Sequence, residues 1–545
     1  MPDSLPPDVG ALDASDPYAR QLQTFPELSP DQVERIRAFG DEVTLQDGEP
    51  LFRRGERRVP FFLVLSGRVD IFDSIDGERR RITTHHANQF TGELDLFNDR
   101  KILVSGCAGG ETKVLRLDRL TFQRMMTAEP DIGEIITRAF VLRRTGLIRH
   151  AQGGVTLVGD RHAAETLDIA RFLRRNGYPL EVVDPDAHDG ELPPRCQHPA
   201  VLLPDGQVLS APTRTELADE LGLSEEIEFG HVHDVAVVGA GPAGLASAVY
   251  AASEGLDTVV IEGLAPGGQA GTSSRIENYL GFPTGISGQA LAGRAQVQAQ
   301  KFGARLVVSR SVERLCCECA GVFRLVLEGG AEVLARSVVV ATGATYRRLP
   351  LENFERFERR GLHYAATAIE ADLCQHEEIA VVGGGNSAGQ AAVFLAQYAE
   401  KVHMLVRGET LASSMSDYLI SRLEAGRNIQ LHFETEVDTL HGEDFLEEVT
   451  LKTRRGARSR RPIRNVFVMI GAQPNTAWLE DCVELDEKGF VKTPGVGGIL
   501  FGTSRPGVVA VGDVQSGSVK RVASAVGQGS VVISGLHRFL SGAAT

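Results

Sequence analysis

Residues 235–244 read Val-Ala-Val-Val-Gly-Ala-Gly-Pro-Ala-Gly. Four apolar residues typical of a buried parallel strand lead directly into Gly239, Gly241 and Gly244, and residues 245–253 have the pattern of a helix. In this context the glycines allow a tight turn, a close approach of pyrophosphate to the backbone, and close packing of helix on strand. The helix N-terminus adds unpaired N–H groups, so the stretch predicts a dinucleotide-binding site.

An acidic residue at the expected distance strengthens this prediction. A second strand predicted over 258–261 ends at Glu262, close to the spacing of about 20 residues expected for a carboxylate that binds ribose. The glycine motif alone is a weak signal, because 59 of the 545 residues are glycine. Strand, motif, helix and acid together are specific.

Length and composition set further limits. A chain of 545 residues predicts three or four domains. It has no apolar run of about eighteen residues, and its first 17 residues are acidic and proline-rich rather than a signal peptide. Seven cysteines form no disulfide framework, so we expect a cytoplasmic protein in a reducing compartment. The net charge of −15 argues against nucleic acid or membrane as main partner, and the basic run at 454–461 predicts a solvated hairpin tip.

Residues 1–150 contain short strand-like segments with Gly-containing turns over 42–117, flanked by helical patterns at 29–39 and 120–144. This pattern resembles a cyclic-nucleotide-binding domain, a β-roll with flanking helices. Residues 90–96, Phe-Thr-Gly-Glu-Leu-Asp-Leu, resemble its phosphate-binding cassette.

The resemblance implies that Gly92 and Glu93 face the ribose and cyclic phosphate. The ungapped position of the family's phosphate-binding arginine is Ile102, however, and Asp95 would repel a phosphate. Arg100 takes the role only if the loop is shortened. A degenerate β-roll used for assembly or regulation is therefore favoured over cyclic-nucleotide binding, and both interpretations stay open.

Residues 152–225 form a second module, with strands predicted at 155–158, 180–183 and 200–203 and helices at 163–174 and near 213–223. It resembles a thioredoxin or glutaredoxin domain, a small α/β fold in which Pro199 is the candidate loop proline. No cysteine occurs between Cys107 and Cys196, so the redox position at the first helix has no thiol. The module is predicted to be a docking or spacer domain. His231 and His233 follow; with no matching ligands nearby in the sequence, an ordinary linker is predicted and no metal site.

Residues 231–545 carry a second fingerprint, Val-Val-Gly-Gly-Gly-Asn-Ser-Ala at 381–388, together with Gly-Gly-Gln-Ala at 267–270, Ala-Thr-Gly-Ala at 341–344 and Gly-Asp-Val at 512–514. Together these motifs resemble low-molecular-weight thioredoxin reductase. The resemblance implies two Rossmann-like three-layer α/β domains: an FAD domain at 231–346 and 473–545, and an inserted NAD(P) domain at 347–472.

The cofactor residues follow from the same resemblance. For FAD they are Gly239, Gly241, Pro242, Ala243, Gly244, Glu262, Gly268, Gln269, Ala270, Asn278, Thr342, Gly512, Asp513, Arg521, Val522 and Ala523. For the nicotinamide cofactor they are Gly383, Gly385, Asn386, Ser387, Ala388 and Arg407. Ala388 replaces a third glycine, and Arg407 stands where an acid would select NADH; an arginine pairs with a 2′-phosphate, so NADPH is favoured and NADH is possible.

The chain departs from the resemblance at Ala365 and Ala368, the positions of the reductases' redox Cys-x-x-Cys. A disulfide needs two sulfurs, so the usual relay cannot run here. Cys316, Cys317 and Cys319 lie in a predicted strand whose geometry disfavours a bridge, and they are interpreted as small strand residues. Cys374 and Cys482, which have no sequence-evident partner, are interpreted as buried structural cysteines.

The sequence therefore predicts hydride transfer from NADPH to FAD and onward to an external acceptor, either a protein, a quinone or a small molecule. No catalytic side chain is predicted, because the flavin carries the chemistry. The resemblance also implies a homodimer. Two alternatives stay open: a sensor in which a cyclic nucleotide or another ligand gates the flavin, and a non-enzymatic flavoprotein platform.

Overall fold

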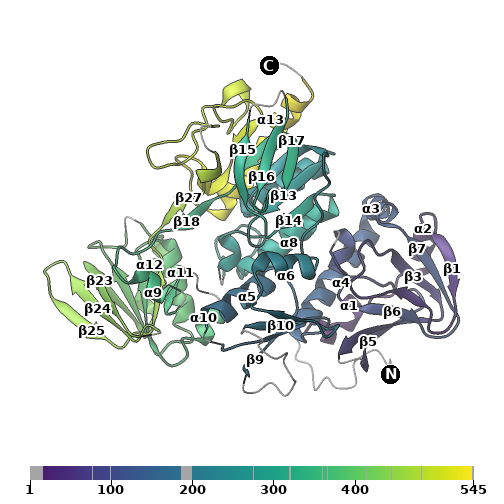
Figure 1. The fold of residues 1–545 in the computed structure, drawn as a ribbon, viewed down its shortest axis with the longest axis horizontal. Coiled ribbons are helices and arrows are strands. Elements are labelled where there is room, and N and C mark those ends of the chain that lie inside the picture. Colours follow the sequence, from purple (N-terminus) through teal and green to yellow (C-terminus); the bar gives the residue numbers. More distant parts are fainter. Residues whose placement is uncertain are drawn as a thin grey trace.

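The computed structural model describes residues 16–75, 78–98, 100–161, 163–185, 199–273, 275–317, 321–358, 360–364, 366, 368–412, 414–443, 445–479 and 482–542. Figure 1 shows four units along the chain: a β-roll unit on the right, a small linking unit at the bottom, and two nucleotide-binding units. We call the latter the first Rossmann unit, which contains the C-terminal helix, and the second Rossmann unit, which lies on the left.

The β-roll unit consists of two antiparallel sheets with helices on both sequence flanks. One sheet has the order β1 (Asp41–Leu45), β7 (Thr112–Leu117), β3 (Phe61–Ser66). The other has the order β2 (Pro50–Phe52), β6 (Ser105–Ala108), β4 (Arg68–Ile75), β5 (Glu78–His86). The helical elements are η1 (Pro17–Ala19), α1 (Gln21–Thr24), α2 (Pro30–Arg37), η2 (Leu94–Phe97), α3 (Arg119–Ala128) and α4 (Pro130–Arg149).

The helical pattern over 120–144 forms two helices, which meet at Glu129. Proline has no N–H to donate and disfavours helical dihedrals in the residue before it. Glu129, directly before Pro130, accordingly has φ −120° and ψ 73°, and Pro130 starts α4 at a position where its missing N–H costs nothing.

The linking unit is a four-stranded sheet of order β11 (Val208–Ser210), β10 (Ala200–Leu202), β8 (Val155–Val158), β9 (Leu180–Val183). Strands β8 and β9 are parallel, whereas β10 is antiparallel to both β8 and β11. Helix α5 (Ala164–Arg175) connects the parallel pair, and α6 (Arg214–Glu220) begins with a capping box of Thr213 and Glu216. One apolar cluster includes buried side chains of both the β-roll unit and the linking unit, so the two are packed together.

The first Rossmann unit has a sheet of order β14 (Arg305–Val308), β13 (Thr258–Glu262), β12 (Val232–Val238), β17 (Glu332–Val340), β16 (Phe323–Leu327), β15 (Val312–Cys316). Strand β28 (Val508–Ala510) pairs in parallel with β17. The helical elements are α7 (Pro242–Ser253), η4 (Ala270–Thr272), α8 (Gly288–Lys301), η5 (Ala477–Leu479), η6 (Val496–Gly498), η7 (Gly512–Val514) and α13 (Val522–Leu540). The central parts of its parallel strands, such as 235–238, 259–261 and 338–340, are apolar and buried, as expected for a sheet covered on both faces.

The second Rossmann unit has a parallel sheet of order β19 (Leu362–His363), β26 (Asn465–Val468), β20 (Glu378–Val382), β21 (Lys401–Val406), β22 (Ile429–Phe433). A three-stranded sheet adjoins it: β23 (Thr435–His441), β24 (Glu448–Thr453), β25 (Arg458–Arg461). Its helices are α9 (Phe354–Phe357), α10 (Ala368–Asp372), α11 (Asn386–Leu395) and α12 (Asp417–Ala425). The pair β18 (Ala344–Tyr346) and β27 (Ala472–Pro474) joins it to the first Rossmann unit, and the basic run forms the predicted exposed hairpin between β24 and β25.

A histidine pair in the second Rossmann unit makes its stability sensitive to acid. His432 Nε2 lies 2.9 Å from His403 Nδ1 on the neighbouring strand, and burial, with a smaller contribution from His403, lowers the pKa of His432 to about 4. An unfolded histidine has a pKa of about 6.5, so the unfolded chain takes up the proton first as the pH falls. The stability from this side chain is present above about pH 6.5 and is lost toward pH 4.

We therefore expect His432→Gln to flatten the decrease in the free energy of unfolding between about pH 6.5 and pH 4, measured by urea unfolding. The exposed His537, changed to glutamine, provides the control and should leave the profile unchanged. Equal slopes for wild type and His432→Gln would contradict the prediction.

Within the described ranges, no helix combines the length and the apolar character needed to cross a membrane.

Candidate functional site

The first fingerprint forms the turn between β12 and α7. Gly239 has a left-handed φ of 102°, and a side chain at Gly244 would overlap the carbonyl oxygen of Gly239, so helix and strand pack at a distance that only glycine permits. Gly241, the N-cap of α7, is different: a Cβ there would meet only the Cα of Gly268, 4.0 Å away. The fingerprint therefore leaves an open cradle at a helix N-terminus, which fits a phosphate.

Glu262 and the loop after it close one side of this turn. The Glu262 carboxylate, at the end of β13, accepts hydrogen bonds from the backbone N–H groups of Ala240 (2.8 Å) and Leu264 (3.0 Å). The Gly267 N–H donates to the carbonyl oxygen of Ala240 at 2.7 Å. A carboxylate has about four lone-pair sites, so Glu262 retains capacity for a ribose hydroxyl.

The structure brings most of the other expected flavin residues to the same place. Gly268 adjoins Gly241, Thr342 adjoins Gly239, and Gly512 adjoins Ala243. The remaining members of this group start a helix or extend the 267–271 loop: Pro242, Gln269, Ala270, Asp513, Arg521, Val522 and Ala523. Asn278 is exposed in a separate loop.

Two of these residues have informative surroundings. The Gln269 side chain donates to the carbonyl oxygen of Ala344, which ties the 267–271 loop to the strand pair between the Rossmann units. Burial raises the pKa of Asp513, with Lys520 opposing the shift. A partly buried carboxyl at a turn before a helix is suited to receive a hydroxyl donor.

The second fingerprint has the same construction between β20 and α11. Gly383 has φ 141°, and a side chain there would overlap the carbonyl oxygen of Met469. Gly385 is the N-cap of α11, with φ −96°, and nothing lies closer than 3.8 Å to a Cβ placed on it. The side-chain oxygen Oδ1 of Asn386 accepts two hydrogen bonds of 2.8 Å, from the backbone N–H and the hydroxyl of Ser416. These bonds fix the start of the helix.

The three other expected nicotinamide residues differ in exposure. Ser387 is exposed in the first turn of α11, and Ala388 is buried in the apolar core of the unit. Arg407 follows β21, is exposed, and has no ion-pair partner among the described residues. A guanidinium in this position is available to a 2′-phosphate.

Among the described residues, the thiol nearest to α10 along the chain is not suited to replace the redox pair of similar reductases. Ala365 lies outside the described residues, and Ala368 is the first residue of α10. Cys374, the nearest cysteine along the chain, is fully buried, and burial raises the pKa of its thiol to about 12. A thiol of this kind stays protonated and inert at neutral pH.

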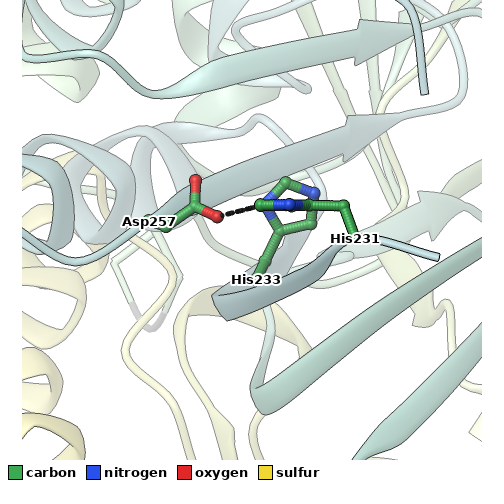
Figure 2. Close-up of side chains that lie close together, drawn as sticks. All are labelled: His231, His233 and Asp257. Atoms are coloured by element: carbon green, nitrogen blue, oxygen red, sulfur yellow. Dashed lines mark hydrogen bonds and ion pairs between the residues drawn. The ribbon is translucent and has the colours of Figure 1, made fainter. Parts of the chain in front are cut away.

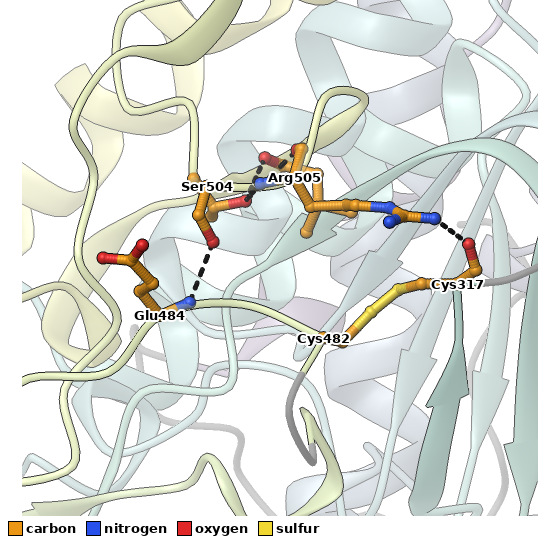
Figure 3. Close-up of a disulfide and its surroundings, with 7 residues drawn as sticks. Cys317, Cys482, Glu484, Ser504 and Arg505 are labelled. Atoms are coloured by element: carbon orange, nitrogen blue, oxygen red, sulfur yellow. Dashed lines mark hydrogen bonds between the residues drawn. A yellow bond between two sulfur atoms is a disulfide. The ribbon is translucent and has the colours of Figure 1, made fainter.

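Two cysteines form a disulfide that the sequence did not predict. The interpretations of Cys317 as a small strand residue and of Cys482 as an unpaired structural cysteine were wrong, because the two are bonded with a Cα–Cα distance of 6.2 Å (Figure 3). They are separated by 165 residues, so no sequence spacing reveals the pair. The bond fastens the segment after η5 to the end of β15, where Arg505 also binds the carbonyl oxygen of Cys317; Cys319 lies outside the described residues.

We expect this disulfide to stabilise the first Rossmann unit, because it closes a very long loop. Cys482→Ser should lower the free energy of unfolding of that unit by about 2–4 kcal/mol under non-reducing conditions. Dithiothreitol should lower the stability of the wild type to the same extent and leave the variant unchanged, as measured by denaturant unfolding. Cys107→Ser is the control, and a variant as stable as wild type would contradict the prediction.

Two linker histidines also have a partner in space. The expectation of no matching ligands near His231 and His233 was wrong, because the fold brings Asp257 close to both. Its Oδ2 lies 2.6 Å from His231 Nε2 and 3.0 Å from His233 Nδ1 (Figure 2). Burial raises the pKa of Asp257, hydrogen bonds from both histidines lower it, and the result is about 2. The three ligand atoms lie within 4.8 Å of one another, and both histidines bond the same carboxylate oxygen of Asp257.

The β-roll cassette binds an arginine of its own chain. Arg144 of α4 donates to Glu93 at 2.6 Å and to Asp95, and all three side chains are buried. Burial raises the pKa of Asp95, and the Arg144 guanidinium lowers it, with a net decrease. Arg100 donates to the carbonyl oxygen of Asn176 in the linking unit at 3.1 Å, and its charge contributes to the lowered pKa of Asp95.

Two parts of the chain match known protein families. Residues 233–529 match the pyridine nucleotide-disulphide oxidoreductase family, and residues 42–129 match the cyclic nucleotide-binding domain. NADPH-dependent thioredoxin reductase 3 of Arabidopsis thaliana is 36% identical over 354 residues, covering 61% of this chain and 65% of that protein, which is less than two thirds of its length. Thioredoxin reductase of Mycoplasmopsis pulmonis is 32% identical over 302 residues, covering 55% of this chain and 95% of that protein. The structure of Lactococcus lactis thioredoxin reductase in the FR conformation matches with a TM-score of 0.53 and 26% identity, covering 57% of this chain and 99% of that one.

A nucleotide fingerprint in each of two linked Rossmann units defines a flavin- and nicotinamide-dependent oxidoreductase. The chain belongs to the pyridine nucleotide-disulphide oxidoreductase family, with FAD and NADPH as its cofactors, and carries a cyclic-nucleotide-binding-type domain in front of the catalytic units.

Proposed function

We propose that this protein transfers a hydride from NADPH to FAD and passes the electrons to an acceptor outside the chain, without an internal redox disulfide. One observation carries the proposal: both fingerprints keep open helix N-termini at Gly241 and Gly385, while Ala365 and Ala368 occupy the cysteine positions of similar reductases. FAD, when bound, supplies the redox chemistry.

The residues of the chain then bind and orient the cofactors. The N-terminus of α7 would hold the FAD pyrophosphate, Glu262 the ribose, and the backbone N–H groups of Val522 and Ala523 the flavin ring. The N-terminus of α11 and Arg407 would hold NADPH. We place the FAD domain at 231–346 and 473–545, the NAD(P) domain at 347–472, and expect a homodimer.

Anaerobic titration of the flavin-loaded protein with NADPH, followed by flavin absorbance, tests this proposal. We expect bleaching to be complete at about one equivalent of NADPH per FAD, because one hydride carries the electrons that FAD accepts. A second equivalent, with new free thiols, would show that a disulfide of the chain, such as Cys317–Cys482, takes electrons from the flavin, and would contradict the proposed route. If neither NADPH nor NADH bleaches the flavin, the hydride-transfer proposal fails and a non-enzymatic flavoprotein platform is favoured.

The linking unit suggests a second, regulatory function. Its strand order and directions support assignment to the thioredoxin fold at 152–225, with Pro199 beside Gly159 at the end of β8. Arg175 donates to the carbonyl oxygen of Gly268 at 2.8 Å, next to the first fingerprint. Asn176 donates to the carbonyl oxygen of Leu264 at 3.2 Å. The end of α5 therefore contacts the segment 264–268, which follows Glu262 and borders the predicted flavin site.

The same segment contacts the β-roll cassette. Arg144 donates to the carbonyl oxygen of Gly177 at 3.2 Å, and Arg100 donates to that of Asn176. Residues 175–177 therefore lie between the cassette and the loop that borders the predicted flavin site. This continuity favours gating of the flavin by a ligand of the β-roll unit, and the test is whether such a ligand changes the rate of flavin reduction by NADPH.

A further inference from the structure

The β-roll unit encloses a cavity of about 60 Å³. Strands β2, β4 and β5 line it on one side, and η2 and α4 line it on the other. Most of the lining is apolar and includes Phe25, Phe52, Ile71, Ile82 and Leu147. The apolar part of this wall suits a hydrocarbon group.

Polar side chains interrupt the apolar wall, including Tyr18, Thr83 and Glu93, and three others have an atom without a hydrogen-bond partner. They are His85 Nδ1, Thr91 Oγ1 and Arg143 Nη2, on residues that are only 2%, 1% and 5% exposed. An unsatisfied buried polar group costs about 1–3 kcal/mol, and more when it is charged. Three such groups on one cavity indicate that a partner is missing there.

Arg143 is joined to the backbone on both sides of Thr91, and the Phe25 ring lies near both Arg143 and His85. Arg143 Nη1 donates to the carbonyl oxygens of Phe90 (3.1 Å) and Gly92 (2.8 Å), which lie on either side of Thr91. The guanidinium carbon lies 5.4 Å from the centroid of the Phe25 ring, and the His85 ring lies 6.0 Å from the same ring.

Among the described residues, no carboxylate forms an ion pair with Arg143. Its other hydrogen bond goes to the carbonyl oxygen of Thr24, and the nearby carboxylates of Glu93 and Asp95 are bound by Arg144 instead. Burial lowers the pKa of Arg143 to about 9, so the side chain stays cationic at neutral pH. Arg143 is thus held by carbonyl oxygens and by the faces of Phe25, Phe90 and Phe140, and a buried cation with neutral partners of this kind is suited to an anionic ligand.

A cyclic nucleotide does not fit this arrangement. Arg144 already occupies the cassette carboxylate that would face the ribose, and apolar Ile102 lines the cavity where a phosphate-binding arginine is expected. Pockets for ligands of nucleotide size are about 300–1,000 Å³, well above the volume here. The ligand must be small, anionic at one end and apolar at the other.

We propose that the β-roll cavity binds a short-chain monocarboxylate, with its carboxylate on Arg143, His85 and Thr91 and its alkyl group among the apolar side chains. The volume limits the alkyl part to about two to four carbon atoms. Binding stands on this cavity alone and is independent of the redox function proposed above.

Isothermal titration calorimetry on the full-length, flavin-loaded protein tests the proposal, with propionate as the probe and the uncharged isostere propionamide as its matched control. We expect propionate to bind at least about tenfold more tightly than propionamide, because hydrogen bonds to charged groups are stronger than neutral ones. Thr91→Val, which keeps the side-chain shape, should weaken propionate binding about tenfold, and Arg143→Gln should abolish it.

Arg138→Gln changes an exposed arginine on the same helix and should bind propionate as wild type does. Thermal unfolding with propionate distinguishes lost binding from lost folding, because a ligand of the native state raises the melting temperature. Three results would overturn the proposal: no heat with propionate, equal affinity for propionamide, or displacement of propionate by cyclic AMP.

Discussion

Replacing Gly385 with aspartate is expected to abolish reduction of the flavin by NADPH while FAD stays bound. Gly385 is the N-cap of α11 in an extended conformation, and the space around its Cα accepts a side chain. Aspartate is a favoured N-cap residue, so the helix itself should tolerate the change. Its carboxylate would lie where the NADPH pyrophosphate is expected, and like charges in contact cost several kcal/mol. The dissociation constant for NADPH should rise at least about 100-fold.

Gly385→Asn is the matched control, because asparagine has the same shape and capping ability without the charge. We expect it to retain flavin reduction with a much smaller rise in the dissociation constant, and both variants to carry FAD in the wild-type ratio. Rapid-mixing absorbance measurements at increasing NADPH concentrations give the dissociation constant of each variant for NADPH. If the aspartate and asparagine variants behave alike, the α11 N-terminus does not receive the pyrophosphate.

The parts of the fold that sequence reasoning predicted best are those specified by local patterns. The strand–glycine–helix runs at 235–253 and 379–395 are recognisable from the sequence alone. Their glycines are required by steric contacts within the motif and its surroundings. The helix break at Pro130 is also local, and its signal was present in the sequence. Tertiary contacts determine two other features, the disulfide of Cys317 with Cys482 and the approach of Asp257 to His231. A single sequence, without an alignment to its homologues, contains no signal for such contacts.

The cassette shows the same limit in a site. Gly92, Glu93 and Asp95 were identified from their motif, and the conflict between Asp95 and a phosphate was recognised. The residue that resolves this conflict, Arg144, lies on a helix about fifty positions away and belongs to no motif. Its role follows only from the packing of α4 against η2, where it replaces an external ligand as the partner of both carboxylates.

Arg144→Met is expected to destabilise the β-roll unit by about 3–5 kcal/mol, because it leaves two buried carboxylates without a partner. Methionine has a similar length and fills the space, so the loss reflects charge rather than a cavity. Urea unfolding followed by circular dichroism, with hydrogen exchange in β3 and β7, assigns the change to this unit. Arg138→Ala on the same helix removes an exposed pair with Glu134 and should cost at most about 0.5 kcal/mol.

Neutralising the carboxylates tests whether the stability lost in Arg144→Met comes from their unpaired charge. In the Arg144→Met background, Glu93→Gln with Asp95→Asn should recover a large part of the stability, because uncharged amides are less costly to bury. Lower pH should act in the same direction: with Arg144 gone, burial holds the pKa values of the two carboxyl groups above those of the unfolded chain, so the difference from wild type shrinks as the pH falls toward about 4. An Arg144→Met protein with wild-type stability at pH 7 would show that the ion cluster does not hold α4 on the cassette.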